Sequence, residues 1–296
     1  MLGTLNYVLI TPARNEAQFI ELTLKSVVAQ TVLPLKWVIV SDGSTDETDD
    51  IVHRYAVEHP WMELVRTPGH VERSFSGKVH AFNAGYAKVK DLNYEIIGNL
   101  DGDTSFDPDY FSFLLQRLSE NTRLGVVGTS YEESSNRTYN YRFASTDHVP
   151  GNCQLFRRQC FEEIGGYSPV KAGAVDTIAV ITARMKGWET RTFIEKASVH
   201  HRKAGQAERG VLVVKFRSGV KDYCVGNHPL WELSRMAYHM TRRPFFVAGF
   251  MLGVGYFWAL VRRMKRPIPF ALVAFHRREQ MRRLRNLAAR ALSGAI

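Results

Sequence analysis

The stretch Lys36-Trp37-Val38-Ile39-Val40-Ser41-Asp42-Gly43-Ser44-Thr45-Asp46 decides the fold. Its first half is an apolar, β-branched run with the length of a buried strand. Its second half is a turn, since Asp-Gly followed by Ser and Thr is typical of a chain reversal and of a helix cap. Residues 46–58 then place Ile51, Val52 and Tyr55 at helical spacing. The stretch therefore predicts a buried strand, a polar turn and a helix.

Further strands and helices are expected to alternate on both sides of this stretch. We expect strands at 5–12, 62–66 and 95–100, and helices at 15–30 and 79–88. Further along, we expect strands near 124–128, 154–156 and 190–194 and a helix at 177–186. Alternation of this kind predicts an α/β, Rossmann-like, mostly parallel sheet with helices on both faces.

Ligands of such sheets bind beyond the carboxyl ends of the strands. Polar clusters follow three of the predicted strands, at Pro12–Glu16, Asp42–Asp46 and Asp101–Asp103. We therefore expect these clusters to converge on one crevice, although they are far apart in the sequence.

The residues of these clusters suit a nucleotide and a metal, but each also has a plainer reading. Asp101 and Asp103 offer two carboxylates to Mg²⁺ or Mn²⁺, or else form a solvated acidic turn. Asp42 can face a nucleobase or a ribose hydroxyl, or else belongs to a turn in which Ser44 or Thr45 caps the next helix. Lys78, near a helix start, can meet a phosphate or is a surface lysine.

Taken together, the motifs resemble the family-2 glycosyltransferases, which have the GT-A fold. The resemblance rests on Pro12-Ala13-Arg14-Asn15-Glu16, Ser26 to Gln30, Val38 to Asp46, Gly77-Lys78 through Gly85, and Asn99-Leu100-Asp101-Gly102-Asp103. It continues more loosely through Leu155-Phe156-Arg157-Arg158 and Ile164-Gly165-Gly166-Tyr167.

The resemblance implies an inverting, metal-dependent transfer of a sugar from a nucleotide-sugar, most simply UDP-linked, in bacterial polysaccharide or glycolipid synthesis. It implies a nucleotide site at Pro12, Ala13, Arg14, Asn15, Glu16, Asp42, Lys78, Asp101 and Gly102. Arg14 departs from the family, which usually has a tyrosine there. Asp103 would bind the metal, Mg²⁺ or Mn²⁺, with a histidine of the pair His200-His201 as a third ligand. Since adjacent strand residues point to opposite faces, only one of the two histidines can face the site.

The resemblance also implies a general base at Asp176, which would take the proton of the acceptor hydroxyl. The family usually has an acidic pair here, and Val175 stands in the first position. As an alternative, Asp176 is a helix N-cap. The polar segment 203–209 is a candidate lid. The motif Gln-x-x-Arg-Trp of processive synthases is missing from the sequence, which favours addition of a single sugar.

Charge divides the chain unevenly. The net charge is +10, and residues 242–296 contain twelve Lys or Arg and one acid, Glu279. Residues 1–241 are therefore close to neutral. We expect a catalytic domain at 1–210, a connecting amphipathic helix region at 211–241 and a basic, apolar C-terminal region at 242–296. Three cysteines, without a closely spaced pair, fit a reducing compartment.

The C-terminal region contains an uncharged run, Phe245–Val261, between arginine clusters, and a basic amphipathic sequence follows it. This pattern predicts membrane-associated helices at the cytoplasmic face of the inner membrane, on an anionic surface, where the acceptor would be a lipid-linked or other saccharide. The run either spans the bilayer or is re-entrant. The plainer reading is a buried core helix.

Two rival functions remain at this point. A nucleotidyltransferase would need a glycine-rich phosphate loop after the first strand, and Pro12–Glu16 contains no glycine. A nucleic-acid-binding protein would use the basic tail, but the apolar run beside the arginines argues against it. We therefore expect no nucleic-acid partner.

Overall fold

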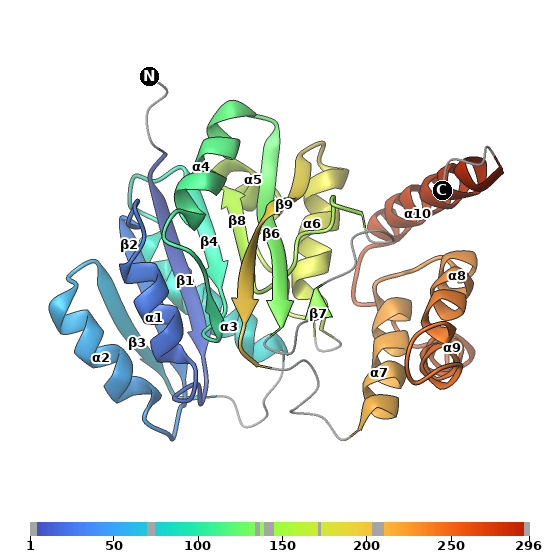
Figure 1. The fold of residues 1–296 in the computed structure, drawn as a ribbon, viewed down its shortest axis with the longest axis horizontal. Helices are drawn as coiled ribbons and strands as arrows, with labels where there is room; N and C mark the ends of the chain where they lie inside the picture. The colour runs from blue at the N-terminus through green and yellow to red at the C-terminus, as the bar shows by residue number, and fades with distance from the viewer. Residues whose placement is uncertain are drawn as a thin grey trace. The chain divides into compact units, whose positions relative to one another are not determined.

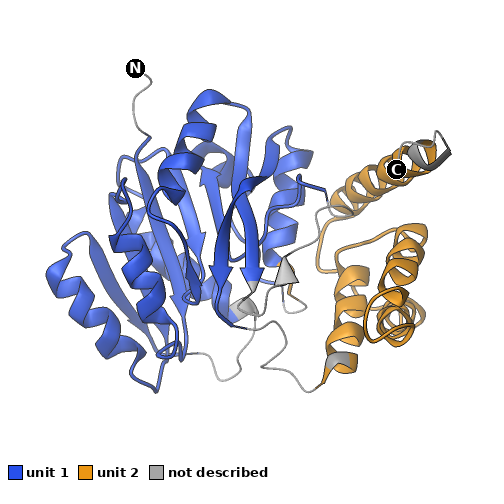
Figure 2. Ribbon diagram, in the orientation of Figure 1, with its two compact units in different colours: residues 1–171, 175–203 blue, residues 172–174, 204–296 orange. Residues whose placement is uncertain are grey.

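The computed structural model describes residues 5–69, 75–133, 137–138, 145–170, 173–202 and 210–292, and the candidate lid at 203–209 lies outside them. These residues form two compact units (Figures 1 and 2). One unit comprises residues 1–171 and 175–203 and contains most of the expected catalytic domain, so we call it the catalytic unit; the other, the helical unit, comprises residues 172–174 and 204–296. The expected regions 211–241 and 242–296 fall together in the helical unit.

The strands of the catalytic unit are β1 (Tyr7–Ala13), β2 (Lys36–Asp42), β3 (Met62–Thr67), β4 (Ile96–Leu100), β5 (Thr104–Ser105), β6 (Leu124–Glu133), β7 (Arg137–Thr138), β8 (Cys153–Arg157) and β9 (Glu189–His200). Its helices are α1 (Ile20–Val28), α2 (Thr48–Glu58), α3 (Phe75–Val89), α4 (Tyr110–Glu120), α5 (Arg158–Glu163) and α6 (Val175–Met185). The α/β sheet with flanking helices is confirmed.

The sheet is mixed rather than mostly parallel. Its nine described strands run in the order β3-β2-β1-β4-β8-β6-β9-β5, with β7 beside β6. β1 to β4 are parallel, as the alternation of strands and helices predicts. β8 is antiparallel to both β4 and β6, because the chain enters it from a turn at the carboxyl end of β4 instead of from a crossover helix.

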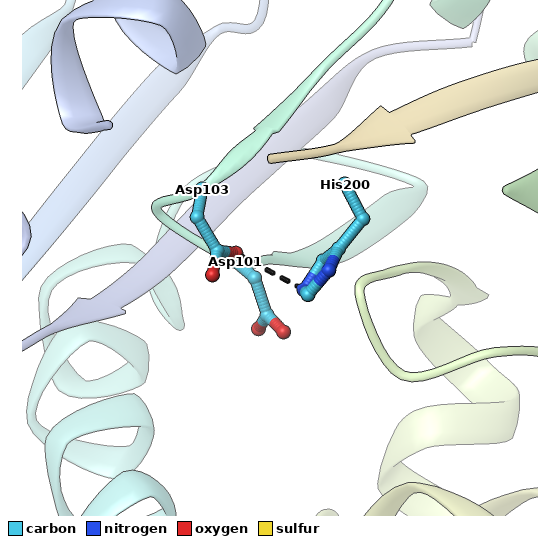
Figure 3. A group of neighbouring side chains, drawn as sticks. All are labelled: Asp101, Asp103 and His200. Carbon is cyan, nitrogen blue, oxygen red and sulfur yellow. Dashed lines mark ion pairs between the residues drawn. The ribbon is translucent and has the colours of Figure 1, made fainter. Parts of the chain in front are cut away.

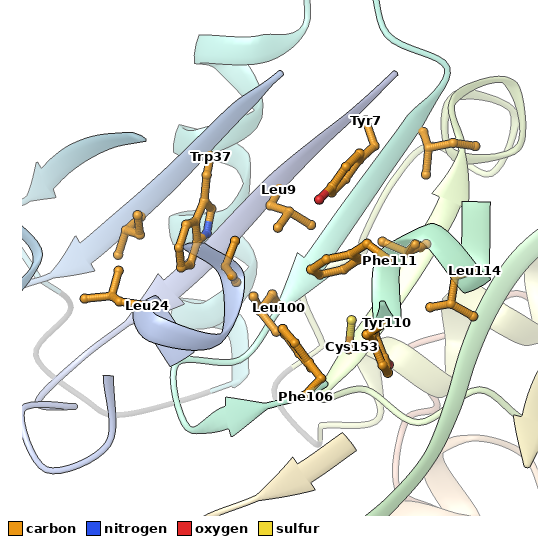
Figure 4. Close-up of a cluster of buried hydrophobic side chains, with 14 of the residues drawn as sticks. Tyr7, Leu9, Leu24, Trp37, Leu100, Phe106, Tyr110, Phe111, Leu114 and Cys153 are labelled. Atoms are coloured by element: carbon orange, nitrogen blue, oxygen red, sulfur yellow. The ribbon is translucent and has the colours of Figure 1, made fainter. Parts of the chain in front are cut away.

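Alternate residues of the central strands feed two hydrophobic cores. Leu9 and Ile39 face a core shared with α1, α2 and α4, which contains Trp37, Tyr110 and Phe111 (Figure 4). Their neighbours Val8 and Val38 face the opposite core, shared with α3, α5 and α6. Because both faces are buried, the strands read as continuous apolar runs, and they hold the polar strand ends rigidly at one edge.

The helical unit consists of α7 (Val211–Cys224), α8 (Pro229–Met240), α9 (Val247–Val261) and α10 (Phe270–Leu292). Glycines bring its helices unusually close. A Cβ at Gly255 of α9 would lie 2.0 Å from the carbonyl oxygen of Phe216 on α7, and one at Gly249 would lie 2.3 Å from the carbonyl oxygen of Met236 on α8. The predicted apolar helix is therefore packed on two sides against neighbouring helices.

A buried polar network lies inside this unit. The Asn227 side-chain oxygen accepts a hydrogen bond from Gln280 at 2.8 Å, and its backbone oxygen accepts one from the Tyr256 hydroxyl at 2.6 Å. The Asn227 amide donates to Glu232 at 3.3 Å. Within the described residues, no helix has the length and apolar character required to cross a membrane.

Candidate active site

The carboxyl ends of β1, β2 and β4 meet at one edge of the sheet, because these strands are parallel neighbours. Side chains tie the loops that follow them together. The Asn15 side-chain oxygen accepts a hydrogen bond from the Thr45 amide at 2.8 Å, and the Glu16 amide donates to the Thr48 hydroxyl at 2.8 Å. Gly102 lies against Glu16, since a Cβ there would be 3.4 Å from the Glu16 Cγ. The three polar clusters predicted from the sequence are thus brought together.

Asn15 adopts a left-handed backbone with φ of 54°, a conformation that asparagine tolerates better than most residues. This conformation turns the chain from β1 toward α1. Pro12 and Ala13 are the last residues of β1, and Arg14 follows half-buried. Asp46, rather than Ser44 or Thr45, accepts a hydrogen bond from the Thr48 amide at the start of α2. Ser44 instead accepts one from the Asn15 amide.

Asp42 ends β2 and is 6% exposed. Its carboxylate accepts a hydrogen bond from the Thr67 hydroxyl at 3.1 Å. Gly43 and Gly69 pass so close to each other that a Cβ at Gly43 would lie 2.7 Å from the Gly69 Cα. Asp42 therefore occupies a fixed position at the same sheet edge as Asp101, with β1 between their strands.

Among the described residues, Asp101, Asp103 and His200 form a group suited to a metal ion. One ligand atom from each lies within 4.8 Å of the others, and the His200 Nε2 is 3.4 Å from Asp103 Oδ1 (Figure 3). Strand pairing brings His200 to Asp103. The strand β5 follows Asp103 directly, and its Thr104 is in register with His200 of β9. Two carboxylates and one imidazole fit a divalent cation such as Mg²⁺ or Mn²⁺.

His201 points elsewhere. Its Nε2 is 2.7 Å from the Ser105 hydroxyl, and its ring stacks on Phe19 with centroids 6.4 Å apart. Burial lowers the pKa of His201 below its ordinary value. The structure therefore brings His200, and not His201, to the carboxylates.

Two cations offset the carboxylates. Lys78 Nζ is 2.5 Å from Asp101 Oδ1, and Arg202 pairs with Glu16 and lies 3.4 Å from Asp103 Oδ2. Burial alone would lower the pKa of Lys78, but the negative charges of Asp101, Asp176 and Asp103 raise it above its ordinary value. Lys78 lies within the first turns of α3, because that helix starts at Phe75, earlier than expected.

Asp176 shares this electrostatic environment. Burial and then the charges of Asp176 and Asp101 raise the pKa of Tyr167. The charge of Asp176 also contributes to the raised pKa of Lys78. Asp176 is the second residue of α6 and so lies inside the helix, two places beyond the N-cap position at Ala174. The candidate base therefore belongs to the same site as the metal-ligand group.

The sequence does not predict how some residues of the site pair with one another. The Glu16–Arg202 pair joins distant segments and has no local signal. Arg157 and Arg158, which belong to the looser part of the resemblance, donate to backbone carbonyls, among them Leu118 and Leu92. Asn99, next to the acidic motif, donates to the Gly151 oxygen at 3.0 Å.

The sequence is similar to a known protein family and to several characterised proteins. Residues 8–178 match the model of "Glycosyl transferase family 2". A poly-beta-1,6-N-acetyl-D-glucosamine synthase of Staphylococcus epidermidis is 25% identical over 197 residues, which cover 62% of this chain and 42% of that protein. The probable glycosyltransferase YdaM of Bacillus subtilis is 27% identical over 207 residues, 62% of this chain and 48% of that protein. The chain thus spans less than half of these relatives.

Solved structures share the fold. A mannosyltransferase from Pyrobaculum calidifontis, in complex with GDP-Man and Mn²⁺, has a TM-score of 0.59 at 21% identity over 99% of this chain and 77% of that one. TarS residues 1–349 of S. aureus, in complex with UDP-GlcNAc, has a TM-score of 0.53 at 12% identity over 86% of this chain and 73% of that one.

Proposed function

Because this chain belongs to glycosyl transferase family 2, we propose that it moves one sugar, with inversion, from a UDP-linked donor to a saccharide or lipid-linked acceptor. The observation that carries the proposal is the group Asp101, Asp103 and His200 at the carboxyl edge of the sheet. Asp103 and His200 would hold the cation with Asp101 beside them, and the cation would neutralise charge on the leaving diphosphate.

The remaining charged residues have complementary tasks. Lys78 and Arg202 offset the carboxylates and leave the site able to accept an anionic donor. Asp42 is directed to the base, and Pro12, Ala13, Arg14, Asn15, Glu16 and Gly102 line the nucleotide pocket. The Pyrobaculum enzyme binds GDP-Man and TarS binds UDP-GlcNAc, which supports a nucleotide-sugar donor here.

Asp176 is the proposed general base. It lies in the first turn of α6, where the charge of its carboxylate helps to raise the pKa of Lys78 and that of Tyr167. In this role it accepts the proton of the acceptor hydroxyl while that oxygen attacks the anomeric carbon from the face opposite the leaving diphosphate. The attack forms the new glycosidic bond, breaks the bond to the diphosphate and inverts the configuration.

The product is a single addition rather than a polymer. The staphylococcal relatives are named as synthases of a polymer, but this sequence lacks the Gln-x-x-Arg-Trp motif of processive synthases. A length analysis of the product formed with excess donor distinguishes the two modes, since chains of several added sugars would contradict single addition.

The donor is tested by a screen of UDP-, GDP- and dTDP-sugars with the full chain. We expect release of the nucleoside diphosphate from a UDP-sugar with Mn²⁺ or Mg²⁺, and loss of this activity in EDTA. Activity that is undiminished by EDTA would contradict the metal, and release from a GDP-sugar alone would replace the UDP assignment.

We also propose that the helical unit binds the cytoplasmic face of the membrane. α9 exposes Phe250, Val254, Trp258 and Val261 along one face, and Phe250 and Val261 are 59% and 80% exposed. Arg242, Arg243, Arg262, Arg263 and Lys265 are exposed at the two ends of this helix. An apolar helix face between cations is complementary to an anionic bilayer.

Vesicle flotation tests this attachment. We expect the full chain to float with vesicles containing phosphatidylglycerol and to stay at the bottom of the gradient with purely zwitterionic vesicles. Retention on DNA in place of flotation would favour a nucleic-acid partner instead.

A further inference from the structure

A short turn, Val149–Asn152, leads into β8 and lies beside the start of α6. It is held at four points. The Val149 oxygen accepts from the Gln154 amide at 2.9 Å and the Gly151 oxygen from the Asn99 amide at 3.0 Å. The Asn152 oxygen accepts from the Asp101 backbone amide at 2.8 Å, and the Asn152 side chain donates to the Ser198 hydroxyl at 2.9 Å. The turn therefore has little freedom to shift.

Gly151 in this turn lies directly against the candidate base. A Cβ built at Gly151 would lie 2.8 Å from Asp176 Oδ2, 2.9 Å from its Cβ and 2.9 Å from its Cγ. All three nearest atoms belong to the Asp176 side chain. The backbone of Gly151 is not left-handed, since Gly151 is absent from the positive-φ glycines of the described chain. The backbone conformation therefore permits an alanine, and the atoms nearest to the new methyl group are those of the Asp176 side chain.

The helix that carries Asp176 is also fixed. Ala179, Val180 and Ala183 of α6 are buried in the core beneath the sheet. Arg184 of the same helix donates to the Asp147 backbone oxygen at 2.8 Å. Since neither the turn nor the helix can retreat, a side chain at position 151 would displace the carboxylate of Asp176.

We propose that Gly151 is a positioning residue that sets where the Asp176 carboxylate lies relative to the metal-ligand group. The same turn touches both parts of the site, because Asn152 binds the backbone of Asp101 while Gly151 contacts Asp176. The turn thus fixes the spacing between the base and the carboxylate of Asp101. This inference rests on the proposed function, in which Asp176 is the base.

Gly151→Ala in the full chain is the test. A displacement of about 1 Å of a catalytic group costs about 100-fold in rate, so we expect kcat for transfer to fall by about that factor. The KM for the donor and the affinity for Mn²⁺ should stay unchanged, since the three atoms nearest to the new methyl group all belong to Asp176. A residue with only a structural role would lower the melting temperature without this split between kcat and KM.

Gly187→Ala is the matched control. Gly187 follows the other end of α6, has φ of 95° and has nothing within 4 Å of a built Cβ. The substitution strains the backbone of the same helix without a contact to Asp176. We expect a lower melting temperature and an unchanged kcat.

A double-mutant cycle with Asp176→Asn separates this inference from the proposed function. If Gly151 acts through Asp176, the double variant keeps the residual kcat of Asp176→Asn, whereas independent effects would multiply. An inactive Asp176→Asn beside a folded, fully active Gly151→Ala overturns the positioning role alone. A fully active Asp176→Asn overturns the base assignment, and the positioning role falls with it.

Discussion

The two units of this protein distribute their polar and apolar residues in opposite ways. The catalytic unit buries aromatic and aliphatic side chains on both faces of a sheet and brings Asp101, Asp103 and His200 together at one edge. The helical unit buries Asn227, Glu232 and Gln280, which are 4%, 0% and 2% exposed, and turns Phe250 and Trp258 outward. The catalytic unit thus has an apolar interior and a polar site at the edge of its sheet. The helical unit has polar residues in its interior and apolar side chains on an exposed face.

The largest expected effect tests the polar edge of the catalytic unit. Asp103→Ala removes a carboxylate of the metal-ligand group and should lower transfer by about 10³-fold, as loss of electrostatic stabilisation does in active sites. Calorimetry should show loss of Mn²⁺ binding, with the circular dichroism spectrum unchanged. Asp91→Ala changes an exposed acid elsewhere in the same unit and should keep full activity. Transfer at the wild-type rate by Asp103→Ala is incompatible with the proposed metal site.

The second prediction concerns the buried acid of the helical unit. Burial, and then the charge of Asp222, raise the pKa of Glu232 from 4.5 to about 7. Between these two pH values the folded state keeps the Glu232 proton and the unfolded state releases it. The contribution of Glu232 to the free energy of unfolding is therefore complete below pH 4.5 and is lost as the pH rises toward 7. The shift corresponds to about 3 kcal/mol in the free energy of unfolding.

Glu232→Gln should remove this pH dependence, because glutamine stays neutral. We expect unfolding in urea to be equally difficult at pH 5 and pH 8 for the variant, whereas the wild-type helical unit should be less stable at pH 8. Glu279→Gln on α10 provides a control of the same chemistry. The catalytic unit supplies a contrast, since its Lys36 lowers the pKa of Glu63 and that stabilisation is lost on acidification instead.

The third prediction tests the glycine contacts of α9. Alanine usually stabilises a helix relative to glycine, but Gly255→Ala would direct its Cβ at the Phe216 carbonyl oxygen. We expect a destabilisation of about 1–3 kcal/mol. In Gly253→Ala the nearest atoms are the flexible end of Met236, which can move aside, so the loss should be smaller. Equal melting temperatures for the two variants would contradict the close approach of α7 and α9.

The smallest effect concerns the outward face of the helical unit. Each arginine near an anionic bilayer contributes about 1 kcal/mol, so Arg262→Ala should weaken binding to phosphatidylglycerol vesicles about fivefold. Lys25→Ala removes an exposed cation from α1 of the catalytic unit and should leave vesicle binding unchanged. If both variants bind equally well, the basic ends of α9 are not the membrane contact.

Local patterns in the sequence predict the parallel half of the sheet well, because β1, β2 and β4 are buried, largely apolar runs and turns or helices separate the strands. The helix α4 was missed, although Tyr110, Phe111, Leu114, Leu115 and Leu118 have the spacing of a buried helix face. The antiparallel placement of β8 depends on pairing between distant segments and has no local signature. The contact between Gly151 and Asp176 is equally invisible in the sequence, since each residue alone reads as part of a turn or a helix start.

The pairing of β5 with β9 has a consequence for how the protein matures. Asp101 and Asp103 are far ahead of His200 in the sequence, and His200 is the last residue of β9, the last strand of the described residues. A nascent chain that has not yet delivered β9 therefore lacks a complete ligand set. An ion that binds only the folded arrangement stabilises it. Binding of the cation would therefore accompany the last step in the folding of the catalytic unit.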